Sequence, residues 1–269
     1  MKKILSVIIL LSAFLSTNAF SQAYPLPKFT VHITGGYGVP TGDFKMDIPP
    51  STPLVEANRP DADNFPYYTK QLVVFGADGK LSLGARGNAR VTFGIDYNMF
   101  SNNADGVFRI DAANTLAVTT FKPKVNVLSV QLGGEYAFQP TQKVNPFVGA
   151  ALAANFFSGS FEFGREVRVK GVQRTGPMDM KSETRIGIVL NAGLDFRLSP
   201  QIGAVIGIKY HLINPIGKGA DDETEIGANE IDLGDKEHVI DDGTTQAARS
   251  LSSFNGYAGI SFFFGMLHK

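Results

Sequence analysis

The stretch from Thr184 to Ile213 alternates apolar with small, polar or charged residues at a period of two. Because successive side chains of a β-strand point to opposite faces, this pattern predicts two strands, each with one apolar face. Only Ser199-Pro200 separates them, which favours a short hairpin with proline in its turn. A strand of about eleven residues tilted by about 40° spans roughly 28 Å, enough to cross an outer membrane. The alternative is a strand pair from a soluble β-sandwich.

Six more stretches alternate in the same way, and the connections between the eight strands read long, short, long, short, long, short, long. Outer-membrane barrels show this parity because their periplasmic turns are short and their extracellular loops long, whereas a sandwich has no reason to keep it. The sequence therefore predicts an all-β fold, an eight-stranded antiparallel up-and-down transmembrane β-barrel. The predicted long connections include Ser101–Lys124, Ser158–Glu183 and Asn214–Arg249.

The N-terminus is typical of a secretory signal peptide. Met1-Lys2-Lys3 precedes an apolar run from Ile4 to Leu15, and small and polar residues follow up to Ala23. We expect residues 1–23 to be removed and residues 24–269 to form the barrel. The sequence contains no cysteine, so neither a lipoprotein attachment site nor a disulfide framework is expected.

The charge balance argues against nucleic acid as a partner. Acidic and basic residues are equal in number, at 25 each, and loss of Lys2 and Lys3 with the signal peptide leaves a slight acidic excess. A nucleic-acid-binding domain would carry a broad basic surface instead. Beyond the signal peptide no apolar stretch is long enough for a transmembrane helix.

Several short motifs carry a resemblance to a known family. The first strand, Phe29 to Val39, leads into Gly36-Tyr37-Gly38-Val39-Pro40-Thr41-Gly42-Asp43-Phe44, and Leu132 to Phe138 leads through a brief turn to Asn145-Pro146-Phe147. These segments resemble the small eight-stranded outer-membrane barrels that include the OmpA-type, OmpW-type and opacity-type proteins. The resemblance implies an integral protein of the Gram-negative outer membrane, in contact with its lipid and lipopolysaccharide. The last strand is similar to the signal read by the barrel-assembly machinery, through Tyr257, Gly259, Phe262 and Phe264.

An eight-stranded barrel is narrow enough for inward side chains to fill it. The strand parity turns a set of charged residues inward, and most of them fall near the short turns. The five near the short turns are Arg86, Arg90, Glu135, Asp195 and Arg197. We interpret these five as a charged plug at the periplasmic end, held by charge-assisted hydrogen bonds, because unpaired charges in a confined lumen are costly. The alternative is a ring of solvated charges around a narrow water-filled opening. The full set of inward charged residues is Arg86, Arg90, Asp96, Glu135, Arg185, Asp195, Arg197 and Lys209.

Two histidines, His32 and His211, also face inward in this register. They could serve a metal or a proton relay, but they are expected at different depths, and hydrogen bonding within the lumen is the simpler interpretation. The acidic stretch Asp221 to Asp242 could bind calcium or bridge divalent cations to lipopolysaccharide, although it matches no EF-hand pattern. An ordinary solvated loop is the alternative.

The sequence contains no nucleophile or metal-protease motif, so we expect neither catalysis nor a cofactor or metal. The favoured hypothesis is a non-catalytic barrel with a structural role or a binding role carried by its surface loops, where it could meet an extracellular ligand. A narrow channel for small hydrophobic molecules is the second hypothesis. Such a channel would need an open, apolar upper barrel, whereas Val127, Ser129, Gln131, Asn191 and Lys209 predict a mixed, filled one.

Overall fold

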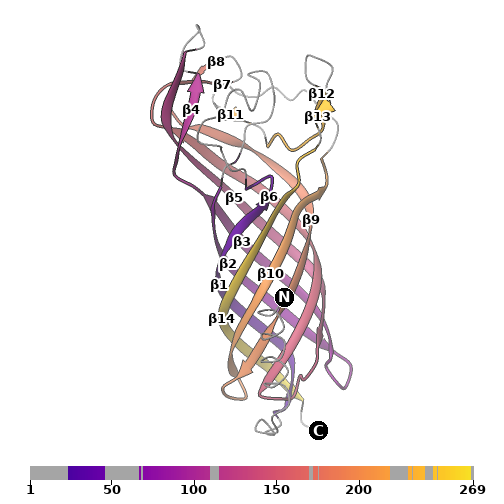
Figure 1. Ribbon diagram of the computed structural model, residues 1–269. Helices are drawn as coiled ribbons and strands as arrows, with labels where there is room; N and C mark the ends of the chain where they lie inside the picture. The colour runs from indigo at the N-terminus through magenta and orange to yellow at the C-terminus, as the bar shows by residue number, and fades with distance from the viewer. Residues whose placement is uncertain are drawn as a thin grey trace, which may run out of the picture.

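Eight long antiparallel strands form the wall of a barrel (Figure 1). The computed structural model describes residues 24–45, 67, 69–109, 115–169, 172–174, 176–218, 230–231, 233–239, 245–246 and 248–267. The wall strands are β1 (Leu26–Gly42), β2 (Gln71–Leu83), β3 (Ala89–Ser101), β5 (Leu116–Ala137), β6 (Val144–Phe163), β9 (Met178–Arg197), β10 (Ile202–Ile216) and β14 (Leu251–Leu267).

Each wall strand pairs with its neighbours along the chain, and β14 pairs with β1 to close the ring. The closing register runs from Leu26 opposite Leu267 to Gly42 opposite Leu251. Closure gives every wall strand two partners, which matters in lipid because no water is present to satisfy a free strand edge. The prediction of an eight-stranded up-and-down barrel is therefore confirmed.

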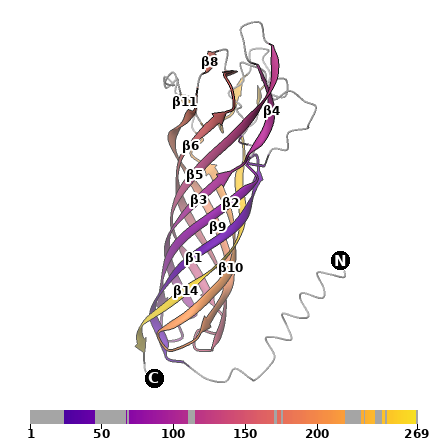
Figure 2. The ribbon, with the colours of Figure 1, turned by 90° about the vertical axis from the view of Figure 1, so that its left-hand side faces the viewer.

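Short turns gather at one end of the barrel and longer connections at the other (Figure 2). The turns cover residues 84–88, 138–143 and 198–201. The first of them needs glycine, because Gly84 and Gly87 both have φ of +67°. In the last, the hydroxyl of Ser199 accepts hydrogen bonds from the amides of Gln201 and Ile202.

The wall strands extend further than the alternation of apolar residues predicted. Residues 101–124 and 158–183 were expected to be loops, but β5 begins at Leu116, β6 runs to Phe163 and β9 begins at Met178. The inward positions Phe121 and Val125 stay apolar, while the outward Lys122 and Lys124 do not. The strands thus continue beyond the part of the wall that is apolar outside, and Figure 1 shows β5 and β6 reaching the upper end of the barrel.

Short strands lie at the end of the barrel where the long connections gather. They are β4 (Ala104–Arg109), β7 (Val167–Val169), β8 (Val172–Arg174), β11 (Glu230–Ile231), β12 (His238–Val239) and β13 (Thr245–Gln246). β4 pairs with β5, β7 with β8, and β12 with β13, all antiparallel, whereas β11 lies parallel to β9.

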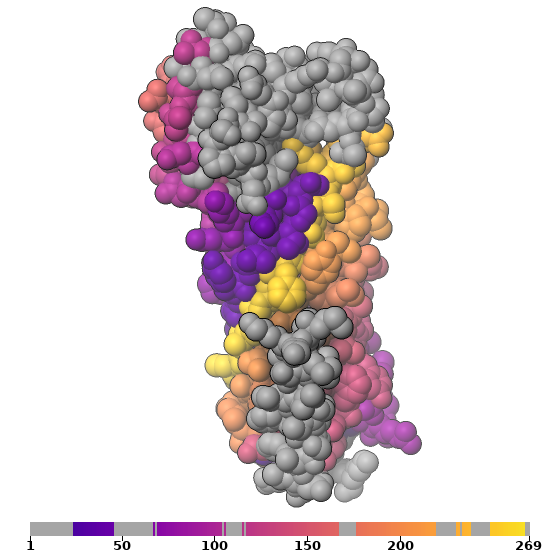
Figure 3. Space-filling model, viewed as in Figure 1, coloured from indigo at the N-terminus to yellow at the C-terminus, as the bar shows by residue number. Residues whose placement is uncertain are grey.

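The outer wall exposes large apolar side chains around the barrel, among them Ile33, Phe93, Leu132, Leu152 and Ile206. The neighbouring outer faces of β1, β14 and β10 run as parallel diagonal bands in Figure 3. A wall that is apolar outside and largely polar inside is the arrangement that lipid requires. In the described part of the chain no helix is long and apolar enough to span a membrane.

Candidate functional site: the barrel lumen

A network of buried charges fills the lumen near the short turns. Glu135 on β5 accepts a hydrogen bond from Lys80 Nζ on β2 at 2.6 Å and from Arg90 Nη1 on β3 at 3.1 Å. All three side chains are at most 2 % exposed. The ammonium of Lys80 also lies 3.7 Å from the centre of the Phe147 ring on β6. A carboxylate with two cationic partners in this confined space is satisfied by charge-assisted hydrogen bonds.

Asp195 on β9 extends this network to the other side of the lumen. Its Oδ2 accepts hydrogen bonds from Arg90 Nη1 and from Asn145 Nδ2, both at 3.1 Å. Its Oδ1 lies 3.1 Å from His32 Nε2 on β1, and the other ring nitrogen of His32 is 3.3 Å from Asp78 on β2. The network therefore links β1, β2, β3, β5, β6 and β9 through their inward side chains.

A second ion pair spans the full width of the lumen at a higher level. Lys209 Nζ on β10 donates to Asp96 on β3, at 3.0 Å to Oδ1 and 2.7 Å to Oδ2, and Gln131 on β5 donates to Asp96 at 2.7 Å. In the ring of eight strands β3 and β10 have three strands between them on either side, so the pair joins opposite walls.

Arg197 lies at the short-turn end, apart from the network. Its guanidinium donates to the backbone carbonyls of Pro25 at 2.6 Å and Pro140 at 2.7 Å. It also lies over the Phe263 ring, 4.8 Å from its centre. Arg197 therefore holds the chain just before β1 against the turn between β5 and β6, and its charge rests against carbonyls and an aromatic face.

One predicted plug residue, Arg86, lies elsewhere, whereas Arg185 is buried inside the barrel as predicted but far from the short turns. Arg86 was expected to face inward, but it is exposed in the turn at residues 84–88, where the chain has left the strand geometry that the parity argument assumed. Arg185 lies at the opposite end of the barrel, where its guanidinium pairs with Asp235 and Glu183. The structure thus brings Arg90, Glu135 and Asp195 together, pairs Asp96 with Lys209, and leaves Arg86, Arg185 and Arg197 outside these groups.

Three members of the network, Asp78, Lys80 and Asn145, were not predicted from the sequence. The second strand was predicted by its end, Leu81 to Arg86, and no role was assigned to Asp78 or Lys80. A signal was available, because Asp78, Lys80 and Ser82 continue the inward parity of β2 back from the turn. Asn145 is the register partner of Asp195, which could not be read from one sequence.

The upper lumen, towards the long connections, is filled by an apolar cluster together with buried polar side chains such as Asn98 and Asn155. Its wall contributes buried residues such as Phe100, Val127, Phe157 and Met178, and loop residues close it from above. This agrees with the expectation of a mixed, filled upper lumen, because Val127 belongs to the apolar cluster while its register partner Asn98 is buried and donates to Ser129. The closing loop residues are Phe44, Tyr67, Ile231 and Leu233.

The two inward histidines lie at different levels. His32 is beside the β14 residue Ser261 in the strand register, and His211 is beside Ser253. Each is almost fully buried. Among the described residues no group of three or more potential ligands could hold a metal ion.

The residues of the predicted assembly signal divide between the two faces of β14. Tyr257 is buried inside, where its ring lies 5.3 Å from Lys209 Nζ. Phe264 is exposed on the outer wall. Gly259 shares the parity of Tyr257, and Phe262 that of Phe264.

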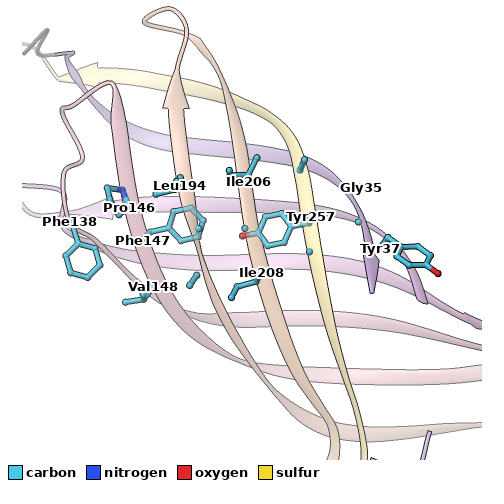
Figure 4. Close-up of a pocket in the computed structure, with 16 residues that line it drawn as sticks. Gly35, Tyr37, Phe138, Pro146, Phe147, Val148, Leu194, Ile206, Ile208 and Tyr257 are labelled. Carbon is cyan, nitrogen blue, oxygen red and sulfur yellow. The ribbon is translucent and has the colours of Figure 1, made fainter. Parts of the chain in front are cut away.

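A hollow of about 820 Å³ lies in the wall where β1, β14, β10, β9 and β6 adjoin (Figure 4). Exposed residues such as Ile206 and Ile208 line it together with the buried rings of Phe147 and Tyr257. Glycines thin the wall here, and a Cβ on Gly207 would lie 2.4 Å from the Tyr257 hydroxyl. The lining contains no charged residue.

The sequence matches the family model described as the outer membrane protein beta-barrel domain over residues 7–234. The chain belongs to this family. It is an integral protein of the Gram-negative outer membrane, and the matched family is a barrel domain that indicates no catalytic activity. Residues 1–23, the predicted signal peptide, lie outside the described residues.

Solved barrels are similar at low sequence identity. Neisserial surface protein A is 13 % identical, with 88 % of this chain and 97 % of that chain covered and a TM-score of 0.45. The attachment invasion locus protein Ail of Yersinia pestis is 13 % identical, with 87 % and 99 % covered and a TM-score of 0.40. OprG of Pseudomonas aeruginosa is 10 % identical, with 90 % and 99 % covered and a TM-score of 0.39. A search of curated protein sequences found no significant match.

Proposed function

We propose that this protein is a non-catalytic outer-membrane scaffold whose lumen is plugged by the charged network, and whose role in the envelope is structural or is carried by its extracellular loops. The single observation that carries the proposal is the set of ion pairs that cross the lumen. Arg90 on β3 reaches Asp195 on β9, and Lys209 on β10 reaches Asp96 on β3.

The energetics of buried charges support a plug that stays closed. Breaking a buried pair by moving one partner away leaves an uncompensated charge, which is strongly unfavourable. Here each carboxylate of the crossing pairs has more than one donor, since Asp195 also accepts from Asn145 and Asp96 also accepts from Gln131. An opening wide enough for ions would have to break several of these contacts together.

The partners follow from the surfaces of the barrel. The exposed apolar wall is suited to the lipid of the outer membrane, and lipopolysaccharide would adjoin it on the extracellular side. The outward aromatic residues of β14 are proposed to be read by the barrel-assembly machinery, as the resemblance implies. An extracellular ligand, if the loops bind one, would meet the end where the long connections gather.

One observation favours a second function, a narrow channel for small hydrophobic molecules. The apolar cluster of the upper lumen, with residues such as Phe100 and Phe157, has the chemistry that such a molecule would need. In the described residues this space is filled by loop side chains, so the channel would require those loops to move.

The test is single-channel recording of the full mature protein refolded into planar lipid bilayers. We expect no discrete conductance steps, because the crossing ion pairs and the apolar cluster of the described residues obstruct the lumen. A heat-dependent shift in gel mobility confirms beforehand that a compact barrel has formed. Discrete conductance from folded protein would contradict the plug and would move the channel to first place.

A further inference from the structure

The segment before the last wall strand turns back into the extracellular mouth of the barrel. Residues 230–231 and 233–235, called the stopper below, include β11, which adds to β9 as a parallel strand with Glu230 beside Asp179. The side chains of Ile231 and Leu233 are 2 % and 1 % exposed and belong to the same apolar cluster as the upper lumen wall. The stopper therefore supplies part of the core of the upper barrel.

A buried carboxylate fixes the end of the stopper. Asp235 is fully buried and accepts hydrogen bonds from Arg185 Nε at 3.0 Å, from Arg185 Nη2 at 2.7 Å and from Asn214 Nδ2 at 2.7 Å. Arg185 belongs to β9 and Asn214 to β10, so the carboxylate is held by two neighbouring wall strands. The sequence had favoured a solvated acidic loop here, and for Asp235 that expectation is wrong.

Further contacts hold the segment on either side of Asp235. The amide of Leu233 donates to Glu183 Oε1 at 3.2 Å, and the amide of Arg249 donates to the Asp235 carbonyl at 3.1 Å. Asn214 also donates to the Arg249 carbonyl at 3.1 Å and accepts from the Leu251 amide at 2.7 Å. Asn214 thus links the Asp235 carboxylate to the backbone of Arg249 and Leu251.

We infer that the stopper is a separable seal of the extracellular mouth and that Asp235 is the residue that anchors it. The inference rests on the proposed closed lumen but concerns only its upper end. The wall strands are held by their own long ladders of hydrogen bonds, whereas the described stopper residues are held by the two-residue strand β11, the bond from Arg249 to the Asp235 carbonyl and side-chain contacts. Loss of the anchor should thus free the stopper and leave the barrel wall folded, exposing the apolar cluster of the upper lumen to the outside.

The absence of cysteine from the sequence allows a direct test by thiol labelling. Val127 is fully buried on the inner face of β5 and belongs to the apolar cluster beneath the stopper. A Val127→Cys variant in the outer membrane of intact cells is treated with a membrane-impermeant maleimide. We expect slow labelling in this background, and with Asp235→Ala added we expect labelling faster on the order of a hundredfold, as loss of one partner of a buried charge pair implies.

Two control variants calibrate the labelling rate. Asp179→Asn changes an exposed carboxylate at the same rim and should leave the labelling rate unchanged, while Ser182→Cys, at an exposed position of β9, reports full reagent access. If Asp235→Ala fails to give the heat-dependent gel shift, Leu233→Asn tests the seal by placing an amide in the apolar cluster. The inference would be overturned if Val127→Cys were labelled at the same rate with and without a stopper substitution in a protein that still folds. Rapid labelling of Val127→Cys without a stopper substitution would also overturn it. The plug proposal would instead fail by conductance of the unaltered protein.

Discussion

Replacement of Glu135 by alanine is expected to lower the free energy of unfolding by about 3–5 kcal/mol, the cost of leaving a buried charge uncompensated. Glu135 is the carboxylate to which Lys80 donates, at 2.6 Å, and Lys80 is 2 % exposed beneath the Phe147 ring. The substitution also removes one of the two carboxylates on Arg90. Unfolding in urea, followed by the loss of the heat-dependent gel shift, measures the change.

An exposed ion pair that also involves β5 provides the control. Lys124 on β5 and Glu162 on β6 form an ion pair at 3.1 Å, but their side chains are 57 % and 42 % exposed. Exposed pairs contribute roughly 0–1 kcal/mol, so Glu162→Ala should change stability little. A second comparison adds Lys80→Met to Glu135→Ala. The double variant no longer buries the unpaired Lys80 ammonium, so it should recover part of the free energy of unfolding that Glu135→Ala loses. If Glu135→Ala were as mild as Glu162→Ala, the network would not be a buried, coupled unit.

The strands and their faces were predictable because lipid imposes a strict rule on the outer wall. Ile186, Leu190, Ile206 and Ile208 were predicted on one face, and all four are exposed on the wall. The sequence alternates between apolar and polar residues only along the part of each strand whose outer face is apolar. Beyond that zone β5 and β6 continue with Lys122, Lys124 and Glu162 outward, and the alternation no longer distinguishes a strand from a loop.

The candidate site was predictable where parity and turn position sufficed. Arg90, Glu135 and Asp195 each lie a few residues from a short turn, so their shared depth followed from the sequence. Arg86 failed because the turn at residues 84–88 reverses the chain through two left-handed glycines and parity ends there. The pairing of Arg185 with Asp235 joins a strand to a loop without any periodic pattern, so only the structure could provide it.

The second large effect is expected at the seam where the barrel closes, for Gly38→Val. A Cβ at Gly38 would lie 2.3 Å from the Phe254 carbonyl oxygen and 2.6 Å from the Asn255 Cβ, both on β14. Backbone cannot yield as a flexible side chain can, so β1 and β14 would have to separate. Unpaired strand edges in lipid cost several kcal/mol for each unsatisfied group. We therefore expect the variant to lose the heat-dependent gel shift.

Gly35 on the same strand supplies the control for this prediction, because a Cβ there would meet only the Phe75 ring, at 4.0 Å. Gly35→Val should therefore fold with the same gel shift as the parent protein. The two substitutions add the same side chain to β1 only three residues apart, one toward the closing strand and one toward open space. A Gly38→Val protein that folds as well as Gly35→Val would show that the seam between β1 and β14 can widen, and that its close backbone approach is not needed for closure.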